Sequence, residues 1–67
     1  MDKHIFTCDE PSCEVTRSEG FVYVHLEPKP ILRSLAFLRL LNCPCCESRL
    51  RYIESFNEEG DLIEIRY

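Results

Sequence analysis

The sequence predicts a small, β-rich (α+β) domain of antiparallel hairpins with one inserted apolar helix. Residues 21–27 are rich in β-branched and aromatic side chains, and residues 49–56 and 62–67 alternate in the manner of strands. Residues 31–41 are almost wholly apolar and follow Pro30, which favours the first turn of a helix. The chain has only 67 residues, and a chain of this length buries only ~60% of the surface that its unfolded form exposes. We therefore expect a single domain, residues 1–67, whose core needs additional support.

The first part of the chain is predicted to be extended around one turn. Residues 4–7 form a short lead-in, and residues 8–13 contain the turn-forming types Asp, Pro and Ser. Residues 14–17 and 21–27 then form two strands joined by residues 18–20, where Gly20 supplies a left-handed conformation. One face of the second strand carries Val22, Val24 and Leu26, and the other carries Phe21, Tyr23 and His25. We expect both faces to be at least partly covered.

A helix is expected from Ile31 to Leu41, and it is apolar nearly all round. A short chain cannot easily bury every face of such a helix, so we expect part of it to meet a second copy or another protein. A fully wrapped core helix and a buried strand are the two alternatives for the same residues.

The C-terminal part reads as a hairpin of residues 49–56 and 62–67 across residues 57–61. Alternation places Leu50, Tyr52 and Phe56 on one face, with a matching stripe of Ile63, Ile65 and Tyr67. A helix over residues 47–57 competes with this interpretation, because Leu50, Ile53 and Phe56 also fit a helical stripe.

The five cysteines offer the missing support. Their number is odd and the N-terminus has no apolar leader, so we expect reduced thiols and a cytoplasmic location. Structural Zn²⁺ takes four ligands, and cysteines two to four residues apart converge on one ion. Cys8 pairs in this way with Cys13, and Cys43 with Cys46. The sequence therefore predicts one structural Zn²⁺.

The segment Cys43-Pro44-Cys45-Cys46-Glu47-Ser48-Arg49-Leu50 resembles the knuckle of the zinc-ribbon family. The resemblance implies metal ligands at Cys8, Cys13, Cys43 and Cys46 and a fold of antiparallel strands around the metal. Cys45 is an alternative to either neighbour within the second pair, and we favour Cys43 and Cys46 because that spacing is the usual one. A helix after Cys46 would make the fold a treble clef with the same ligands.

The two histidines, His4 and His25, are interpreted as surface or packing residues, because four cysteines already complete the ligand set. The motif Cys43-Pro44-Cys45-Cys46 also resembles the active site of glutaredoxin-like enzymes. That chemistry needs an αβ fold around the motif, and no such pattern is present. We therefore favour a structural metal site over a thiol redox site.

Charge is unevenly distributed along a chain whose formal net charge is −4. Residues 29–51 hold one acid and five bases, which are candidate contacts to nucleic acid or to a partner: Lys29, Arg33, Arg39, Arg49 and Arg51. The acidic remainder of the chain opposes strong attraction of the whole molecule to a polyanion.

The expected function is that of a protein-interaction or regulatory module, self-associating or binding a protein partner through residues 31–41. The alternative is a nucleic-acid-binding zinc ribbon in transcription or translation control. No nucleophile with its base, no phosphate loop and no open metal position is legible, so we expect neither an enzyme nor a small-molecule substrate. No apolar run is long enough to span a membrane.

Overall fold

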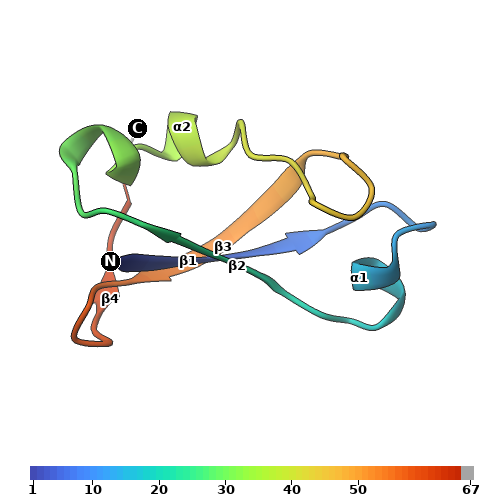
Figure 1. Cartoon of the computed structure of the whole chain (residues 1–67), viewed down its shortest axis with the longest axis horizontal. Helices are drawn as coiled ribbons and strands as arrows, with labels where there is room; N and C mark the ends of the chain where they lie inside the picture. Colours follow the sequence, from blue (N-terminus) through green and yellow to red (C-terminus); the bar gives the residue numbers. More distant parts are fainter. Residues whose placement is uncertain (66–67) are drawn as a thin grey trace.

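The computed structural model describes residues 1–65 and contains one antiparallel sheet in the order β2-β1-β3-β4 (Figure 1). Its strands are β1 (Asp2–Cys8), β2 (Val22–Leu26), β3 (Leu50–Phe56) and β4 (Leu62–Ile63). Three short helical segments connect them: α1 (Glu14–Arg17), the 3-10 turn η1 (Pro30–Arg33) and α2 (Leu35–Leu38). The sequence-based expectation of a β-rich fold is confirmed at this level.

The N-terminal lead-in belongs to β1, which is one of the two inner strands of the sheet. β1 pairs with β2 on one side and with β3 on the other. Its side chains alternate between a buried face and a half-buried face, and the buried set is Asp2, His4, Phe6 and Cys8. Since β1 is hydrogen-bonded on both sides, it fixes the positions of both neighbouring strands.

The hairpin predicted between residues 14–17 and 21–27 does not form. Residues 14–17 are α1, in which Arg17 donates its N–H to Cys13 O at 3.0 Å. The left-handed residue of the following turn is Glu19, with φ 54°, and not Gly20. β2 pairs with β1 instead, so the expected pairing of residues 14–17 with residues 21–27 is replaced by a pairing between more distant segments.

β2 is a strand as expected, but its partner is β1. Val22, Val24 and Leu26 pack against the core, while Tyr23 and His25 are exposed on the opposite face. The outer face is only partly covered, since Tyr23 is 54% exposed and Lys3 lies over its ring.

The single helix predicted over residues 31–41 is also wrong. Ser34 has extended dihedrals, φ −88° and ψ 129°, and it separates η1 from α2. Leu38 is fully buried, and Phe37 and Leu41 pack against the core. Two large side chains of the segment stay outside it, since Ile31 is 72% and Leu40 is 64% exposed.

The C-terminal hairpin is confirmed for the residues that the structure describes. β3 and β4 pair across residues 57–61, where Gly60 has φ 87°. The competing helix over residues 47–57 is not formed. The structure therefore lacks, in these residues, the helix after Cys46 that would make the fold a treble clef. Tyr67 lies outside the described residues.

A β-bulge corrects the predicted face of Phe56. Phe6 lies opposite Tyr52 and Ile5 lies opposite Glu54, so Ile53 is an extra residue in β3. The extra residue reverses the alternation after it, and Phe56 lies opposite Lys3 on the outer face. Leu50 and Tyr52 remain on the core side.

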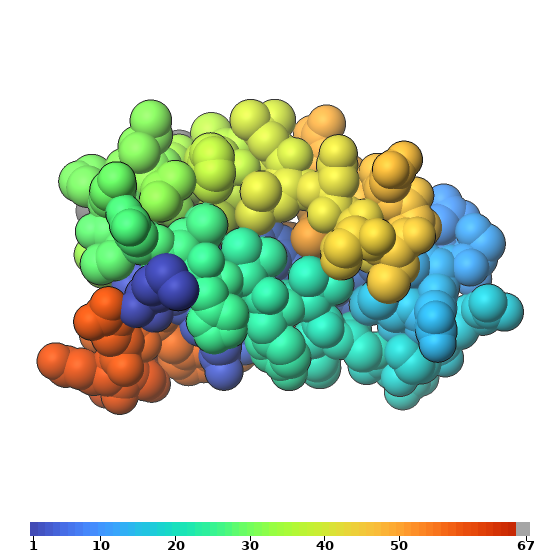
Figure 2. Space-filling model, in the orientation of Figure 1, coloured from blue at the N-terminus to red at the C-terminus, as the bar shows by residue number. Residues whose placement is uncertain are grey.

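The core is small, and half of its buried residues are cysteines. Its buried residues are Phe6, Cys8, Cys13, Leu38, Cys43 and Leu50. Figure 2 shows the segment around residues 43–48 in contact with residues 8–18 at one end of the molecule. The cysteine pairs, distant in sequence, thus meet inside the hydrophobic core.

Candidate metal centre

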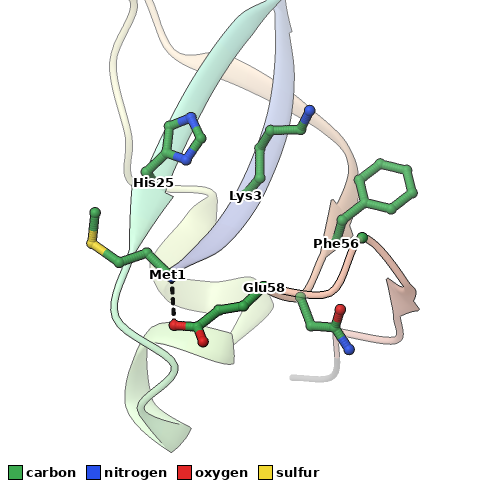
Figure 3. A pocket seen from close by; sticks show the side chains of 7 residues that line it. Met1, Lys3, His25, Phe56 and Glu58 are labelled. Atoms are coloured by element: carbon green, nitrogen blue, oxygen red, sulfur yellow. Dashed lines mark hydrogen bonds and ion pairs between the residues drawn. The ribbon is translucent and has the colours of Figure 1, made fainter.

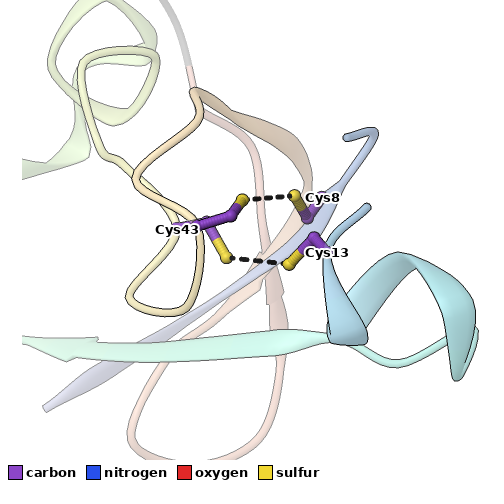
Figure 4. A group of neighbouring side chains, drawn as sticks. Cys8, Cys13 and Cys43 are labelled. Atoms are coloured by element: carbon purple, nitrogen blue, oxygen red, sulfur yellow. Dashed lines mark hydrogen bonds between the residues drawn. The ribbon is translucent and has the colours of Figure 1, made fainter. Parts of the chain in front are cut away.

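Two loops deliver the four cysteines to one point. Cys8 ends β1 and Cys13 immediately precedes α1, while Cys43 and Cys46 lie on the loop between α2 and β3. The pairing of Cys8 with Leu50 in neighbouring strands brings the second loop against the first. Figure 4 shows Cys8, Cys13 and Cys43 pointing toward one another.

The sulfur positions fit a four-coordinate metal ion. Cys8 Sγ is 3.4 Å from Cys46 Sγ, and Cys13 Sγ is 3.7 Å from Cys43 Sγ. The Sγ atoms of all four lie within 4.8 Å of one another. Four sulfurs placed tetrahedrally at a Zn–S distance of ~2.3 Å are separated by about 3.8 Å. Only small shifts are needed to reach that arrangement.

The second loop is a tight knuckle held by its backbone. Cys43 donates its N–H to Ser48 O at 2.7 Å and accepts from Glu47 N–H at 2.9 Å. Glu47 has φ 62°, a left-handed conformation that side chains other than glycine seldom adopt. The turn closes next to an isolated antiparallel bridge between Asn42 and Arg49. This geometry places both sulfurs of the loop on one side.

The first loop is fixed by contacts from within itself and from α1. Cys13 donates its N–H to Glu10 O at 3.0 Å. The Thr16 hydroxyl donates to Cys8 O, so the helical turn is tied to the end of β1. The formation of α1, which the sequence did not predict, therefore positions one ligand pair.

Backbone amides prepare the second loop to carry thiolates. The N–H groups of Cys46 and Cys45 lower the pKa of the Cys43 thiol. The backbone and side chain of Ser48 lower the pKa of Cys46 to about 7. Burial raises the pKa of Cys13 to about 12, so this thiol needs a cation to ionise at neutral pH. The donor set is thus suited to a metal that binds thiolates.

The other candidate ligands lie elsewhere. Cys45 is exposed and is not part of the four-sulfur cluster. His25 is exposed on β2. His4 is buried, and its Nδ1 lies 2.6 Å from the Ser55 hydroxyl, which in turn lies 2.8 Å from Tyr52 Oη. Sequence reasoning did not detect this buried polar chain, because its members come from different strands.

The fold places the five basic side chains of residues 29–51 in different surroundings. Lys29 pairs with Glu27, and Arg33 binds the buried Asp2 carboxylate through Nε at 2.8 Å and Nη2 at 3.3 Å. The other three converge on one groove of ≈ 520 Å³ lined by Asp9, Leu35, Arg39, Arg49, Leu50, Arg51 and Tyr52. We call it the arginine groove.

A separate hollow of ≈ 410 Å³ lies at the opposite end of the sheet, near the N-terminus (Figure 3). The Met1 amino group binds Glu58 there, and Lys3 lies over the rings of Tyr23 and Phe56 at 5.2 and 6.0 Å from their centroids. The amino group of Met1 is thus paired with a carboxylate, and Lys3 contacts aromatic rings. His25 also lines the hollow.

Comparison of the chain with protein-family models, with curated proteins and with solved structures found no significant match. No helix among residues 1–65 is long and apolar enough to cross a membrane. The geometry of the site brings four cysteines close enough to hold a metal ion.

Proposed function

We propose that this chain is a small structural-zinc protein with a zinc-ribbon-like fold, and that it acts as a protein-interaction or regulatory module in the cytoplasm. The observation that carries the proposal is the convergence of Cys8, Cys13, Cys43 and Cys46 within 4.8 Å. Soft thiolate ligands in a tetrahedron select Zn²⁺ over Mg²⁺ or Ca²⁺, which prefer oxygen.

The proposed role of the ion is structural. A ligand set of four sulfurs leaves no coordination position for water or substrate. Three of these cysteines are buried core residues, so metal binding and core formation are the same event. This supports a binding module more than a catalyst.

Metal analysis tests the structural part of the proposal. We expect about one zinc per chain in protein purified without added metal, with Cys45 as the readily titrated thiol. Replacement of zinc by Co²⁺ should give the visible absorption of a tetrahedral thiolate site. A metal-free protein whose thiols all react at once with Ellman's reagent while it stays folded would rule the proposal out.

The interaction part is supported by exposed apolar side chains on residues 31–41. Ile31 is 72% and Leu40 is 64% exposed, although neighbouring side chains of the same segment are in the core. Light scattering after size exclusion, at several concentrations, measures self-association. We expect Ile31→Ser with Leu40→Ser to reduce it, and Leu62→Ser, which changes a side chain that is 66% exposed outside the segment, to leave it unchanged. A wild type that is monomeric at every concentration would exclude self-association.

The second candidate function is nucleic-acid binding, and the arginine groove favours it. Arg39, Arg49 and Arg51 lie at one groove although they come from two segments of the chain. Phosphate contacts weaken with salt, so titration of labelled DNA and RNA at ~50 mM and at higher salt gives the test. Absence of binding at the low salt concentration would exclude this function.

A further inference from the structure

Two basic side chains and one aromatic ring form a row across the outer face of the sheet. Lys3 on β1 lies opposite His25 on β2 and opposite Phe56 on β3. Side chains that are directly opposite in neighbouring antiparallel strands project from the same face. The order across the sheet is therefore His25, Lys3, Phe56, and the row spans two strand spacings, about 10 Å.

This row lines the hollow of ≈ 410 Å³ described above, which we call the N-terminal hollow (Figure 3). The loop between β3 and β4 lines it with Asn57, Glu58 and Gly60, and Met1 lines it from the beginning of the chain. Sites for small molecules have volumes of about 300–1,000 Å³. The N-terminal hollow is therefore large enough for a small organic ligand.

The basic side chains of the hollow favour an anion. Lys3 and His25 are directly opposite each other, and two side chains that can both be cationic repel each other in such positions. Neither forms an ion pair with an acidic side chain within residues 1–65. Glu58 lines the hollow but is bound to the Met1 amino group, and Glu54 lies one row further along β3, outside the lining. A phosphate has enough oxygens to accept hydrogen bonds from both bases at once.

An aromatic surface lies beside the same cation. Nζ of Lys3 is 5.2 Å from the centroid of the Tyr23 ring and 6.0 Å from that of the Phe56 ring. Phe56 is half-buried and lines the hollow. A ring in this position can stack on a planar group of a ligand while the neighbouring cation holds the charged group. Phe56 therefore offers the hollow a surface for a planar group.

Asn57 adds an oriented hydrogen-bond donor. Its Oδ1 accepts the backbone N–H groups of Glu59 and Asp61, each at 2.9 Å. These two bonds occupy both lone pairs of the oxygen and fix the side-chain amide. The Nδ2 amino group is then the part of the amide that can bind a ligand in the hollow, next to the ring of Phe56.

We propose that the N-terminal hollow binds a nucleotide, with the phosphate between Lys3 and His25 and the base stacked on Phe56. Nδ2 of Asn57 donates to an acceptor on the edge of the base. The site goes beyond the functions proposed above, because none of its lining residues belongs to residues 31–41 or to the arginine groove.

A nucleotide uses the basic, aromatic and amide groups together. Inorganic phosphate leaves the ring of Phe56 without a partner, and an uncharged ring leaves Lys3 and His25 without an anion. The nucleotide can be free or part of a single strand, since both present the same phosphate and base. The experiment below distinguishes these two sources.

Calorimetry and amide NMR of the zinc-loaded, full-length protein test the site, with adenosine monophosphate as the probe. We expect its addition to shift the amide signals of Lys3, His25, Phe56 and Asn57. Adenosine and inorganic phosphate should each bind at least about tenfold more weakly. Adenosine that binds equally tightly overturns the phosphate contact, and phosphate or sulfate that binds equally tightly overturns the stacking. A folded, zinc-containing protein without shifts at millimolar adenosine monophosphate overturns the site and leaves the structural-zinc function standing.

Matched variants separate the site from general effects of charge and of aromatic surface. Lys3→Gln should weaken binding of adenosine monophosphate about tenfold, whereas Arg17→Gln makes the same change on α1, outside the hollow, and should leave it unchanged. Phe56→Leu should also weaken binding about tenfold, and Phe21→Leu, at a ring that is 53% exposed outside the hollow, should not. Full affinity in Lys3→Gln or in Phe56→Leu overturns the proposed contacts.

A short oligoadenylate distinguishes the two sources of the nucleotide. A site for free nucleotides binds adenosine monophosphate as tightly as the oligomer, whereas a site for a single strand binds the oligomer more tightly; Lys3→Gln weakens either. Oligomer binding that is unchanged in Lys3→Gln and lost in Arg49→Glu assigns the strand to the arginine groove and overturns the present site. Tighter binding of O-phosphotyrosine than of adenosine monophosphate overturns the nucleotide in favour of a phosphorylated peptide.

Discussion

Cys8 and Leu50 lie directly opposite each other in the neighbouring strands β1 and β3. Leu50 follows the second cysteine loop, so this single pairing brings together segments that are 42 positions apart. The sheet register and the four-sulfur cluster therefore join the same two parts of the chain. Closing so long a loop is entropically costly, and a metal that bridges it offsets that cost.

Removal of the metal should unfold the protein. Binding of Zn²⁺ to small thiolate sites releases about 10–16 kcal/mol, and here it is coupled to formation of the core. We expect a strong chelator, or Cys13→Ser, to abolish the native far-ultraviolet circular dichroism and the dispersion of amide signals. Cys45→Ser is the matched control, since Cys45 is exposed and outside the cluster. A Cys45→Ser protein that loses its metal while Cys43→Ser keeps it would reverse the ligand assignment.

His4 should make the stability of the protein fall in mild acid. Burial lowers the pKa of His4 below 6.5; the nearby Arg33 and His25 lower it further, and only Asp2 opposes them. The unfolded chain then binds one more proton than the native state between the two pKa values. The neutral imidazole's contribution is complete above pH 6.5 and is lost as the pH falls toward the native pKa.

The slope from one such group reaches about 1.4 kcal/mol per pH unit. Denaturant unfolding of the zinc-loaded wild type and of His4→Asn, between pH 7.5 and the onset of metal loss, measures it. The His4→Asn profile should be flatter than that of the wild type, because the variant has no imidazole at this buried position. Identical profiles for the two proteins would show that His4 does not titrate on unfolding.

The pair of Asp2 and Arg33 should stabilise the fold more than an exposed ion pair does. Asp2 is 1% exposed and receives two hydrogen bonds from the Arg33 guanidinium. Arg33→Ala leaves this carboxylate buried without its cation, at a cost that we expect to be about 2 kcal/mol because Arg33 is itself partly solvated. Lys29→Ala breaks the exposed pair with Glu27 and should cost under about 0.5 kcal/mol. Equal effects in chemical denaturation would contradict this ranking.

Two leucines that are two positions apart, Leu38 and Leu40, should differ sharply in their effect on stability. Leu38 is the last residue of α2 and is fully buried in the core, whereas Leu40 is 64% exposed. Leu38→Ala should lower the free energy of unfolding by about 2–4 kcal/mol through lost burial and an unfilled cavity. Leu40→Ala should change it by less than about 0.5 kcal/mol. Thermal or denaturant unfolding of the zinc-loaded variants makes the comparison, and a large loss for Leu40→Ala would indicate that its surface is covered in solution.

The sequence alone predicted those features of the fold and the site that depend on contacts between residues close together in the chain. The spacing of Cys8 with Cys13 and of Cys43 with Cys46 predicted two ligand pairs, because each pair is brought together by its own short loop. The β-branched and aromatic residues of 22–26 predicted β2, and alternation predicted the hairpin of β3 with β4. These features depend on neighbours within a few residues.

The tertiary structure decided what depends on contacts between distant segments. It made β1 an inner strand, gave β2 a partner other than residues 14–17, and divided residues 31–41 at Ser34 so that Leu38 reaches the core. It also placed the bulge at Ile53, which turns Phe56 to the outer face, and gathered Arg39 with Arg49 and Arg51 at the arginine groove. The physical reason is that strand pairing and core packing are settled by competition among all segments, and a sequence pattern records only the preference of each segment by itself.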